Sequence, residues 1–283
     1  MNAALKYEWA RLTSLRSTWW ISGGAILISV GFTFFVAMSI QLSTPGELEG
    51  SADGDYSRFI LDAAMTQFSN VDPSFYLLAY IVAIMGVLAW GHEYRHGMIR
   101  ATLTAVPNRN AVWSAKLIVV GAWVSAIVVI TCLLSLLVTL LWFVGLDFEF
   151  DLPYLMGAVF SRIVFTVLLT WLVMGATVLI RHQTFSLVML YLWPLGIENM
   201  VRLLFSIVAA INGDEGIYQA TRFLPFNAGG RIIQNWSISS GDLQRNLDLF
   251  GDPLSAWGGF LVFGGFTAAV LVGSLVAFNK RDA

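Results

Sequence analysis

The residues best suited to chemistry lie in one short stretch, from His92 to His96. Its letters, His-Glu-Tyr-Arg-His, satisfy the pattern H-E-x-x-H. On a helix, that spacing places two imidazoles on one face to hold zinc, with the glutamate as general base. The context is poor, because Gly97 follows where a metalloprotease helix must continue, and the only other histidine is His182. A membrane-embedded zinc metallopeptidase is therefore the alternative hypothesis, and we expect no metal in this chain.

The elements that carry this stretch follow from an unusually apolar composition. The 283 residues are 57% hydrophobic and 12% charged, with a mean hydropathy of +0.73. Soluble domains are roughly a quarter charged, and a soluble core of this length cannot hide so much apolar surface. The net charge of -2 argues against nucleic-acid binding, and the single cysteine, Cys132, has no intramolecular partner for a disulfide. The composition predicts an integral membrane protein.

Six apolar segments are long enough to cross a membrane, for which about 20 residues are needed. The stretch 152–211 contains two of them, separated at Arg181-His182-Gln183. Pro194 and Gly196 lie inside the second and predict a kink or break. A short fifth span followed by a half-inserted helix therefore stays open. We expect an all-α polytopic fold, one transmembrane domain over 1–283, with spans at about 19–42, 74–91, 117–145, 154–180, 184–210 and 255–279.

The distribution of Lys and Arg predicts the orientation. An even number of spans places both termini on one side, which holds ten of the sixteen basic residues but only Glu8, Glu93 and Asp282 among the acids. Cytoplasmic loops carry an excess of Lys and Arg. We therefore expect both termini in the cytoplasm and the protein in the cell membrane. The ten basic residues are Lys6, Arg11, Arg16, Arg95, Arg100, Arg109, Lys116, Arg181, Lys280 and Arg281.

Residues 3–18 have the pattern of an amphipathic helix lying in the membrane plane. Leu5, Trp9, Leu12 and Trp19 recur at helical spacing, while the basic residues occupy other faces. Trp and Arg on such a helix suit contact with lipid at the cytoplasmic surface.

Three charged residues fall inside predicted spans. Arg162 lies about eight residues into the fourth span, where a charge costs roughly 2.5–3.5 kcal/mol on insertion scales and must face protein or water. Glu198 falls at a comparable depth in the fifth. We expect either an Arg162–Glu198 pair between helices, or a Glu198–Arg202 pair one turn apart on the same helix.

The stretch Glu93-Tyr94-Arg95-His96-Gly97-Met98-Ile99-Arg100, with Leu103 and Pro107 behind it, resembles the segment between the second and third spans of the ABC-2 type permeases. These are the membrane subunits of type-2 ABC exporters. Members from high-GC bacteria often read E-Y-R-x-G-T-I-R, and Met98 stands here where Thr is commoner. The start, Glu8-Trp9-Ala10-Arg11-Leu12, is similar to their in-plane helix, and the resemblance covers the whole layout.

The stretch after the second span starts at a membrane end, is expected to turn at Gly97, and stops at Pro107. The resemblance implies that residues 92–106 form a coupling helix that seats on a separate ATPase subunit. Glu93 would anchor this turn through Arg95, Arg100 or a cation of the partner. Two ATPase copies and a second permease copy, identical or closely related, are then the expected partners. The sequence contains no G-x-x-x-x-G-K-[ST] phosphate loop, so ATP and Mg are expected in the partner chain and not in this one, which is no enzyme itself. The expected coupling residues are His92, Glu93, Tyr94, Arg95, His96, Gly97, Met98, Ile99, Arg100 and Leu103.

The implied activity is export of a lipophilic or amphipathic small molecule, such as a drug or antibiotic, by alternating access. A lipid, an ion or a polysaccharide precursor stays open as cargo, as does a sensor or assembly factor without an ATPase. Short helices in the outer segment 212–254 are expected to cap the exit as an external gate. Aromatic and Met side chains on spans two and five are candidates for a lipophilic path at a dimer interface, or for ordinary helix packing: Tyr76, Tyr80, Met85, Tyr191 and Trp193.

Overall fold

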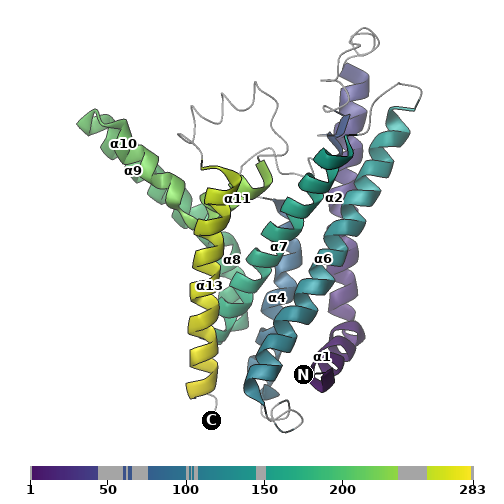
Figure 1. The fold of residues 1–283 in the computed structure, drawn as a ribbon, viewed down its shortest axis with the longest axis vertical. Coiled ribbons are helices and arrows are strands. Elements are labelled where there is room, and N and C mark those ends of the chain that lie inside the picture. The colour runs from purple at the N-terminus through teal and green to yellow at the C-terminus, as the bar shows by residue number, and fades with distance from the viewer. Residues whose placement is uncertain are drawn as a thin grey trace.

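The computed structural model of the protein describes residues 2–43, 60, 61, 63–65, 76–99, 102, 104, 108–144, 151–234 and 254–281. Regular structure in this part of the chain is helical, and none of these residues lies in a strand, which confirms the all-α prediction (Figure 1). The α-helices are α1 (Asn2–Ser14), α2 (Arg16–Ser43), α4 (Leu77–His96), α6 (Arg109–Trp142), α7 (Leu152–Ile180), α8 (Gln183–Leu192), α9 (Glu198–Asn212), α10 (Glu215–Gln219), α11 (Pro225–Gln234) and α13 (Ala256–Arg281).

Six segments are long and apolar enough to cross a membrane, as the sequence predicted. The start of α1 and the end of α13 lie at the same end of the bundle, together with the end of α4 and the start of α6 (Figure 1). This architecture fits a multi-pass membrane protein. The six candidate spans are Arg16–Leu42, Leu77–Arg95, Arg109–Trp142, Leu152–Ile180, Gln183–Asn212 and Ala256–Lys280.

Helices α4 and α7 form the centre of the bundle and pack against each other. Their apolar windows are 61% and 56% buried, against 17% for the fifth and sixth spans. The contact is close because Gly86 carries no side chain: a Cβ there would lie 2.8 Å from the Thr170 carbonyl oxygen. Small residues at such contacts let helix backbones approach in a membrane. Helix α2 packs on α6, and α13 on α7.

The amphipathic segment and the first span differ from the prediction in their boundary. The structure has two helices separated at Leu15, where the sequence predicted one helix over 3–18 and a span from 19. Trp19 Nε1 donates to the Thr13 carbonyl oxygen at 2.9 Å and bridges the turn. The first span therefore begins three residues early, at Arg16.

The buried face of α1 also differs from the predicted stripe. Ala4, Glu8 and Leu12 are buried, at helical spacing, whereas Trp9 is 47% exposed and Trp19 is 57% exposed. Both tryptophans meet the Trp123 ring of α6 edge-on. The packed face of α1 thus contains a carboxylate, which the apolar pattern did not indicate.

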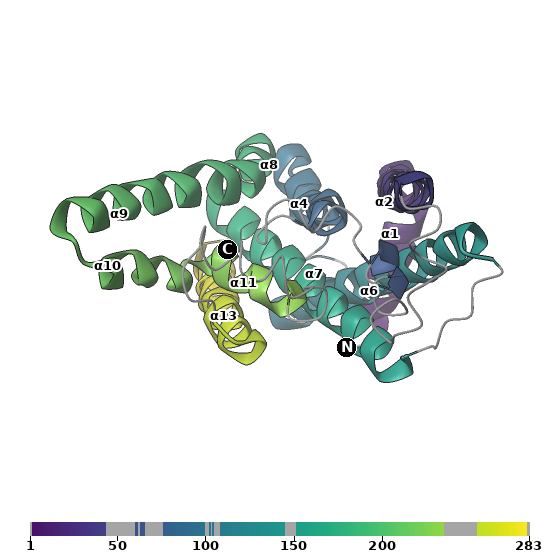
Figure 2. The same ribbon diagram turned by 90° about the horizontal axis from the view of Figure 1, so that it is seen from above.

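The fifth span is one continuous helical segment with a distortion at the predicted place. A π-helical turn, Trp193–Ile197, joins α8 to α9 and contains both Pro194 and Gly196. Proline removes a backbone donor, and π-turns inside α-helices accommodate such sites. Beyond this turn α9 leaves the bundle, and α10 returns beside it (Figures 1 and 2).

Part of the outer segment is described, up to residue 234, and it contains the short helices that the sequence predicted. After α10 and a 3₁₀ turn (Ala220–Phe223), α11 packs against α13 and α7. Gly259 of α13 permits this contact, because a Cβ there would overlap the Ala228 carbonyl oxygen of α11. Residues 235–253 of the predicted outer segment lie outside the described residues.

Candidate functional site

The candidate coupling segment begins inside α4 and turns at Gly97. Residues 92–96 form the last turn of α4, so the predicted separate helix over 92–106 does not start at His92. Gly97 has φ +64° and donates its N–H to the Glu93 carbonyl oxygen, as does Met98 at 3.0 Å. Glycine is favoured there because it adopts the left-handed conformation without strain. The predicted turn at Gly97 is confirmed; Arg100 and Leu103 lie outside the described residues.

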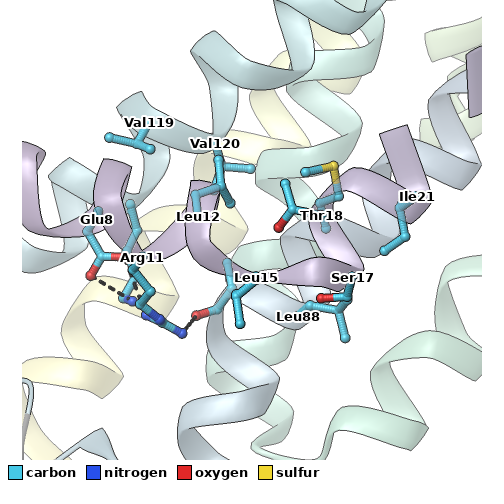
Figure 3. A pocket seen from close by; sticks show the side chains of 13 residues that line it. Glu8, Arg11, Leu12, Leu15, Ser17, Thr18, Ile21, Leu88, Val119 and Val120 are labelled. Carbon is cyan, nitrogen blue, oxygen red and sulfur yellow. Dashed lines mark hydrogen bonds and ion pairs between the residues drawn. The ribbon is translucent and has the colours of Figure 1, made fainter. Parts of the chain in front are cut away.

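A buried group of four charged side chains lies at the base of this turn; we call Glu8, Arg11, Glu93 and Lys116 the four-charge cluster. Glu93 is 1% exposed, and its Oε1 is bound by Arg11 Nη1 and, at 2.7 Å, by Lys116 Nζ. Glu8 lies 2.9 Å from Lys116 and 3.3 Å from Arg11. Figure 3 shows Glu8 and Arg11 facing each other. The cluster joins α1, α4 and α6.

The cluster is electrically balanced, with two carboxylates and two cations. Lys116 is fully buried, and its ammonium lies 5.0 Å from the centroid of the Trp90 ring. Arg11 Nη2 also donates to the Ala89 carbonyl oxygen at 3.1 Å, and Thr102 Oγ1 lies 3.4 Å from Glu93 Oε1. Buried charges persist when paired and hydrogen-bonded, and removing one partner costs about 3–5 kcal/mol. Removing any one member of the four-charge cluster should therefore destabilise the folded protein.

The sequence identified Glu93 as an anchor but named different partners. We expected Arg95, Arg100 or a cation of another protein, whereas the described partners are Arg11 and Lys116. Arg95 is exposed. Arg11 and Lys116 lie 82 and 23 residues from Glu93 in sequence, so no local spacing connects them. The sequence signal for this contact was that the predicted cytoplasmic side, rich in Lys and Arg, holds only three acids, two of which are Glu8 and Glu93.

Two residues of the zinc hypothesis, Glu93 and His182, are engaged in other bonds. Glu93, the supposed general base, is bound by two cations inside the bundle. His182, the third candidate ligand, accepts the Phe185 N–H on its Nδ1 at 3.2 Å and caps α8. Within the described part of the chain, no three His, Cys, Asp or Glu side chains come together as metal ligands. The arrangement of these described residues does not fit a zinc site.

Arg162 is fully buried and binds backbone oxygens. Its Nη1 donates to Ala158 O at 3.0 Å and its Nη2 to Met65 O, while its guanidinium lies 6.0 Å from the centroid of the Tyr76 ring. The predicted Arg162–Glu198 ion pair is therefore wrong. The physical reason is that two backbone carbonyl oxygens, those of Ala158 and Met65, satisfy the guanidinium without a second charge.

Glu198 caps α11. Its Oε1 accepts the Phe226 N–H at 2.9 Å and its Oε2 the Asn227 N–H at 3.0 Å. The first N–H groups of a helix have no intrahelical acceptor, and a carboxylate there is also favoured by the helix dipole. The carboxylate thus ties the outer helix to the fifth span, directly after its π-turn. The sequence missed this contact, because the two groups lie 28 residues apart.

Arg202 and Arg231 are buried near Glu198. Arg202 donates through Nη2 to Asn199 Oδ1. Burial and the neighbouring Arg202 lower the pKa of Arg231, on α11, to about 10. Arg231 stays charged at neutral pH, so this outer site concentrates positive charge around one carboxylate.

The five candidate path residues separate into two groups. Tyr76, Tyr80 and Met85 are buried in the core of this one chain, so they do not face a path in it. Tyr191 lies beside Tyr80, with ring centroids 6.1 Å apart and its hydroxyl donating to Tyr80 O at 3.4 Å. Packing, the alternative that we weighed for these residues, accounts for them. Trp193 alone lines an apolar cavity.

This cavity, the apolar groove, lies between α7, α8, α11 and α13 and has a volume of about 300 Å³. Among the described residues that line it, Ser186 contributes the only hydroxyl and none carries a charge. A second crevice, beside the four-charge cluster, measures about 20 Å³ and has room for about one water molecule (Figure 3). The groove is lined by Leu172, Val173, Ala176, Leu179, Ile180, Phe185, Ser186, Met189, Leu190, Trp193, Phe226, Phe266 and Val270.

No family model matches this chain, and no curated protein matches it either. The likeness to ABC-2 type permeases therefore depends on the residues around Glu93 and on the layout of the spans.

Proposed function

We propose that this chain is the membrane-spanning permease subunit of an ABC transporter. It exports a lipophilic or amphipathic small molecule by alternating access, and a separate ATPase subunit supplies the energy. It works as a pair with a second permease copy, identical or closely related, in the cell membrane with both termini in the cytoplasm.

The observation that carries this proposal is the four-charge cluster at the base of the Gly97 turn. Glu93 lies one helical turn before Gly97 and is bound from α1 by Arg11 and from α6 by Lys116. A force applied to the turn therefore acts on three helices together. Such rigid elements, joined by paired charges, transmit motion between a binding surface and a bundle. This arrangement suits a chain that receives a movement from a partner.

The apolar groove supports a lipophilic cargo. Its volume suits a small molecule, since ligand cavities measure about 300–1,000 Å³ and are mostly apolar. The absence of charged side chains from its lining favours an uncharged occupant. Phe226 of α11 lines the groove next to the backbone N–H that Glu198 accepts. A movement at the π-turn would thus alter both the groove and the predicted external gate.

Co-expression with an ABC ATPase, sought among the reading frames next to this gene, tests the proposal. We expect the two proteins to purify as a complex and to accumulate a fluorescent, uncharged lipophilic dye inside inverted membrane vesicles only when ATP is hydrolysed. Met98→Glu, at a side chain 45% exposed on the turn, should abolish ATP-driven export. Ala3→Glu introduces the same charge at an exposed position on the first turn of α1 and serves as the matched control.

Two results would contradict the proposal. One is a purified permease that neither binds the ATPase nor changes its rate of hydrolysis. The other is export that continues unchanged in the Met98→Glu variant while the complex stays intact.

A further inference from the structure

Two of the three acids on the predicted cytoplasmic side point into the protein. Glu8 is 6% exposed and Glu93 is 1% exposed, and both are neutralised inside the four-charge cluster. The third, Asp282, lies outside the described residues. In the sequence, these acids belong to segments on the predicted cytoplasmic side. In the structure, Glu8 and Glu93 are buried and do not contribute to the surface at this end.

Four other cations described at this end are exposed. Lys6, Arg16, Arg95 and Lys280 are exposed, and Arg181 is half-buried. Because the four-charge cluster is neutral, it contributes no net charge to this face. Among the described residues, the exposed charged side chains at this end of the bundle are therefore all basic.

The Gly97 turn combines this positive charge with an apolar tip. Arg95 is exposed just before the turn, Met98 is 45% exposed within it, and Ile99 is half-buried behind it. The Arg181 guanidinium lies 5.8 Å from the Tyr94 ring centroid, which places the α7–α8 junction beside the turn. The turn thus presents an apolar centre flanked by cations on two elements. Exposed tryptophans, typical of contact with lipid headgroups, lie on α1 and at the start of α2 (Trp9, Trp19 and Trp20) and not on this turn.

We propose that the surface receiving the Gly97 turn is an acidic groove with an apolar floor, and that Arg95 is the contact residue that selects it. This inference rests on the proposed function and specifies the chemistry of the ATPase partner. Complementary charge at an interface accelerates association and excludes wrong partners, because like charges brought together are strongly unfavourable. Met98 enters the apolar floor, and the acidic rim pairs with Arg95 and Arg181.

The test measures binding of the permease, in nanodiscs, to the ABC ATPase that co-purifies with it, as a function of NaCl concentration. Arg95→Glu is compared with Arg95→Gln and with Lys280→Glu, which reverses an exposed charge at the same end on α13. At low salt we expect Arg95→Glu to weaken binding about tenfold or more, Arg95→Gln to weaken it less, and Lys280→Glu to change it less than about twofold. At 1 M NaCl the differences should shrink, because the Debye length falls to about 3 Å.

A photoreactive amino acid at position 98 identifies the receiving segment by mass spectrometry. An acidic residue of that segment, changed to lysine, should restore binding to the Arg95→Glu variant. The inference is overturned if Arg95→Glu binds like the wild type, if its loss of affinity is the same at every salt concentration, or if the cross-linked segment carries no acids.

Nanodiscs of phosphatidylcholine, with and without phosphatidylglycerol, form the second arm of the experiment. Dependence of the cross-link on the anionic lipid and not on the ATPase assigns the turn to headgroups and also overturns the inference.

The two proposals fail differently. If the wild-type chain binds no ATPase, both the proposed function and the acidic groove are contradicted. If the ATPase binds with an affinity that depends neither on the NaCl concentration nor on Arg95, the proposed function stands and only the acidic groove is wrong.

Discussion

Replacing Glu93 with glutamine tests whether the four-charge cluster holds the base of the turn. The side chain keeps its shape, but the cluster then contains Arg11 and Lys116 against Glu8 alone, so one positive charge is left uncompensated. Because Lys116 is fully buried and Glu93 is 1% exposed, little water compensates for the loss. Removing one partner of such a buried pair costs about 3–5 kcal/mol. We expect Glu93→Gln to lower the free energy of unfolding by an amount in this range.

The companion variant restores the charge balance. Lys116→Met together with Glu93→Gln leaves Arg11 facing Glu8, a neutral pair, and replaces a buried cation with an apolar side chain of similar length. Apolar replacement of a buried ion pair is often neutral or stabilising. The double variant should therefore be more stable than Glu93→Gln alone, which makes the coupling energy between the two sites large.

Reversible unfolding of the purified protein in mixed micelles, followed by circular dichroism, gives the four free energies of this cycle. Lys6→Gln, which also removes one charge but from an exposed side chain on the same helix as Arg11, serves as the control and should stay within about 0.5 kcal/mol of the wild type. A Glu93→Gln variant as stable as the wild type would refute the reasoning. So would a double variant whose loss equals the sum of the two single losses, because independent charges do not couple.

Three further changes test other contacts. Glu198→Gln should weaken the cap of α11 by about 1–2 kcal/mol and speed hydrogen exchange at the Phe226 amide, whereas unchanged exchange would show that the cap is not needed. Ala176→Phe should fill the apolar groove and reduce export without reducing ATPase binding; Ala122→Phe, on the exposed face of α6, is its matched control, and equal export from both would remove the groove from the path. Gly97→Ala should destabilise the protein by about 1 kcal/mol in thermal unfolding, because φ +64° strains a Cβ, and a neutral effect would mean that the turn relaxes.

The failures of sequence reasoning share a cause. One of our two expectations was that Arg162 and Glu198 pair, because a charge inside a span must face protein or water. Arg162 instead binds the carbonyl oxygens of Ala158 and Met65, and Glu198 binds the N–H groups at the start of α11. Residues 65 and 226 lie outside the six candidate spans, and hydropathy does not indicate where such segments contact a span.

The sequence by itself determined the number of spans, the turn at Gly97, the distortion at Pro194 and the segregation of basic residues to one side. These features depend on composition, on local spacing and on the conformational limits of single residues, all of which are readable along one dimension. The tertiary structure alone decided that Glu8 and Glu93 point inward to Arg11 and Lys116, and that the apolar groove lies beside Trp193. Helix neighbours in a membrane are chosen by close packing of small residues and by buried polar contacts, and neither appears as a pattern in the sequence.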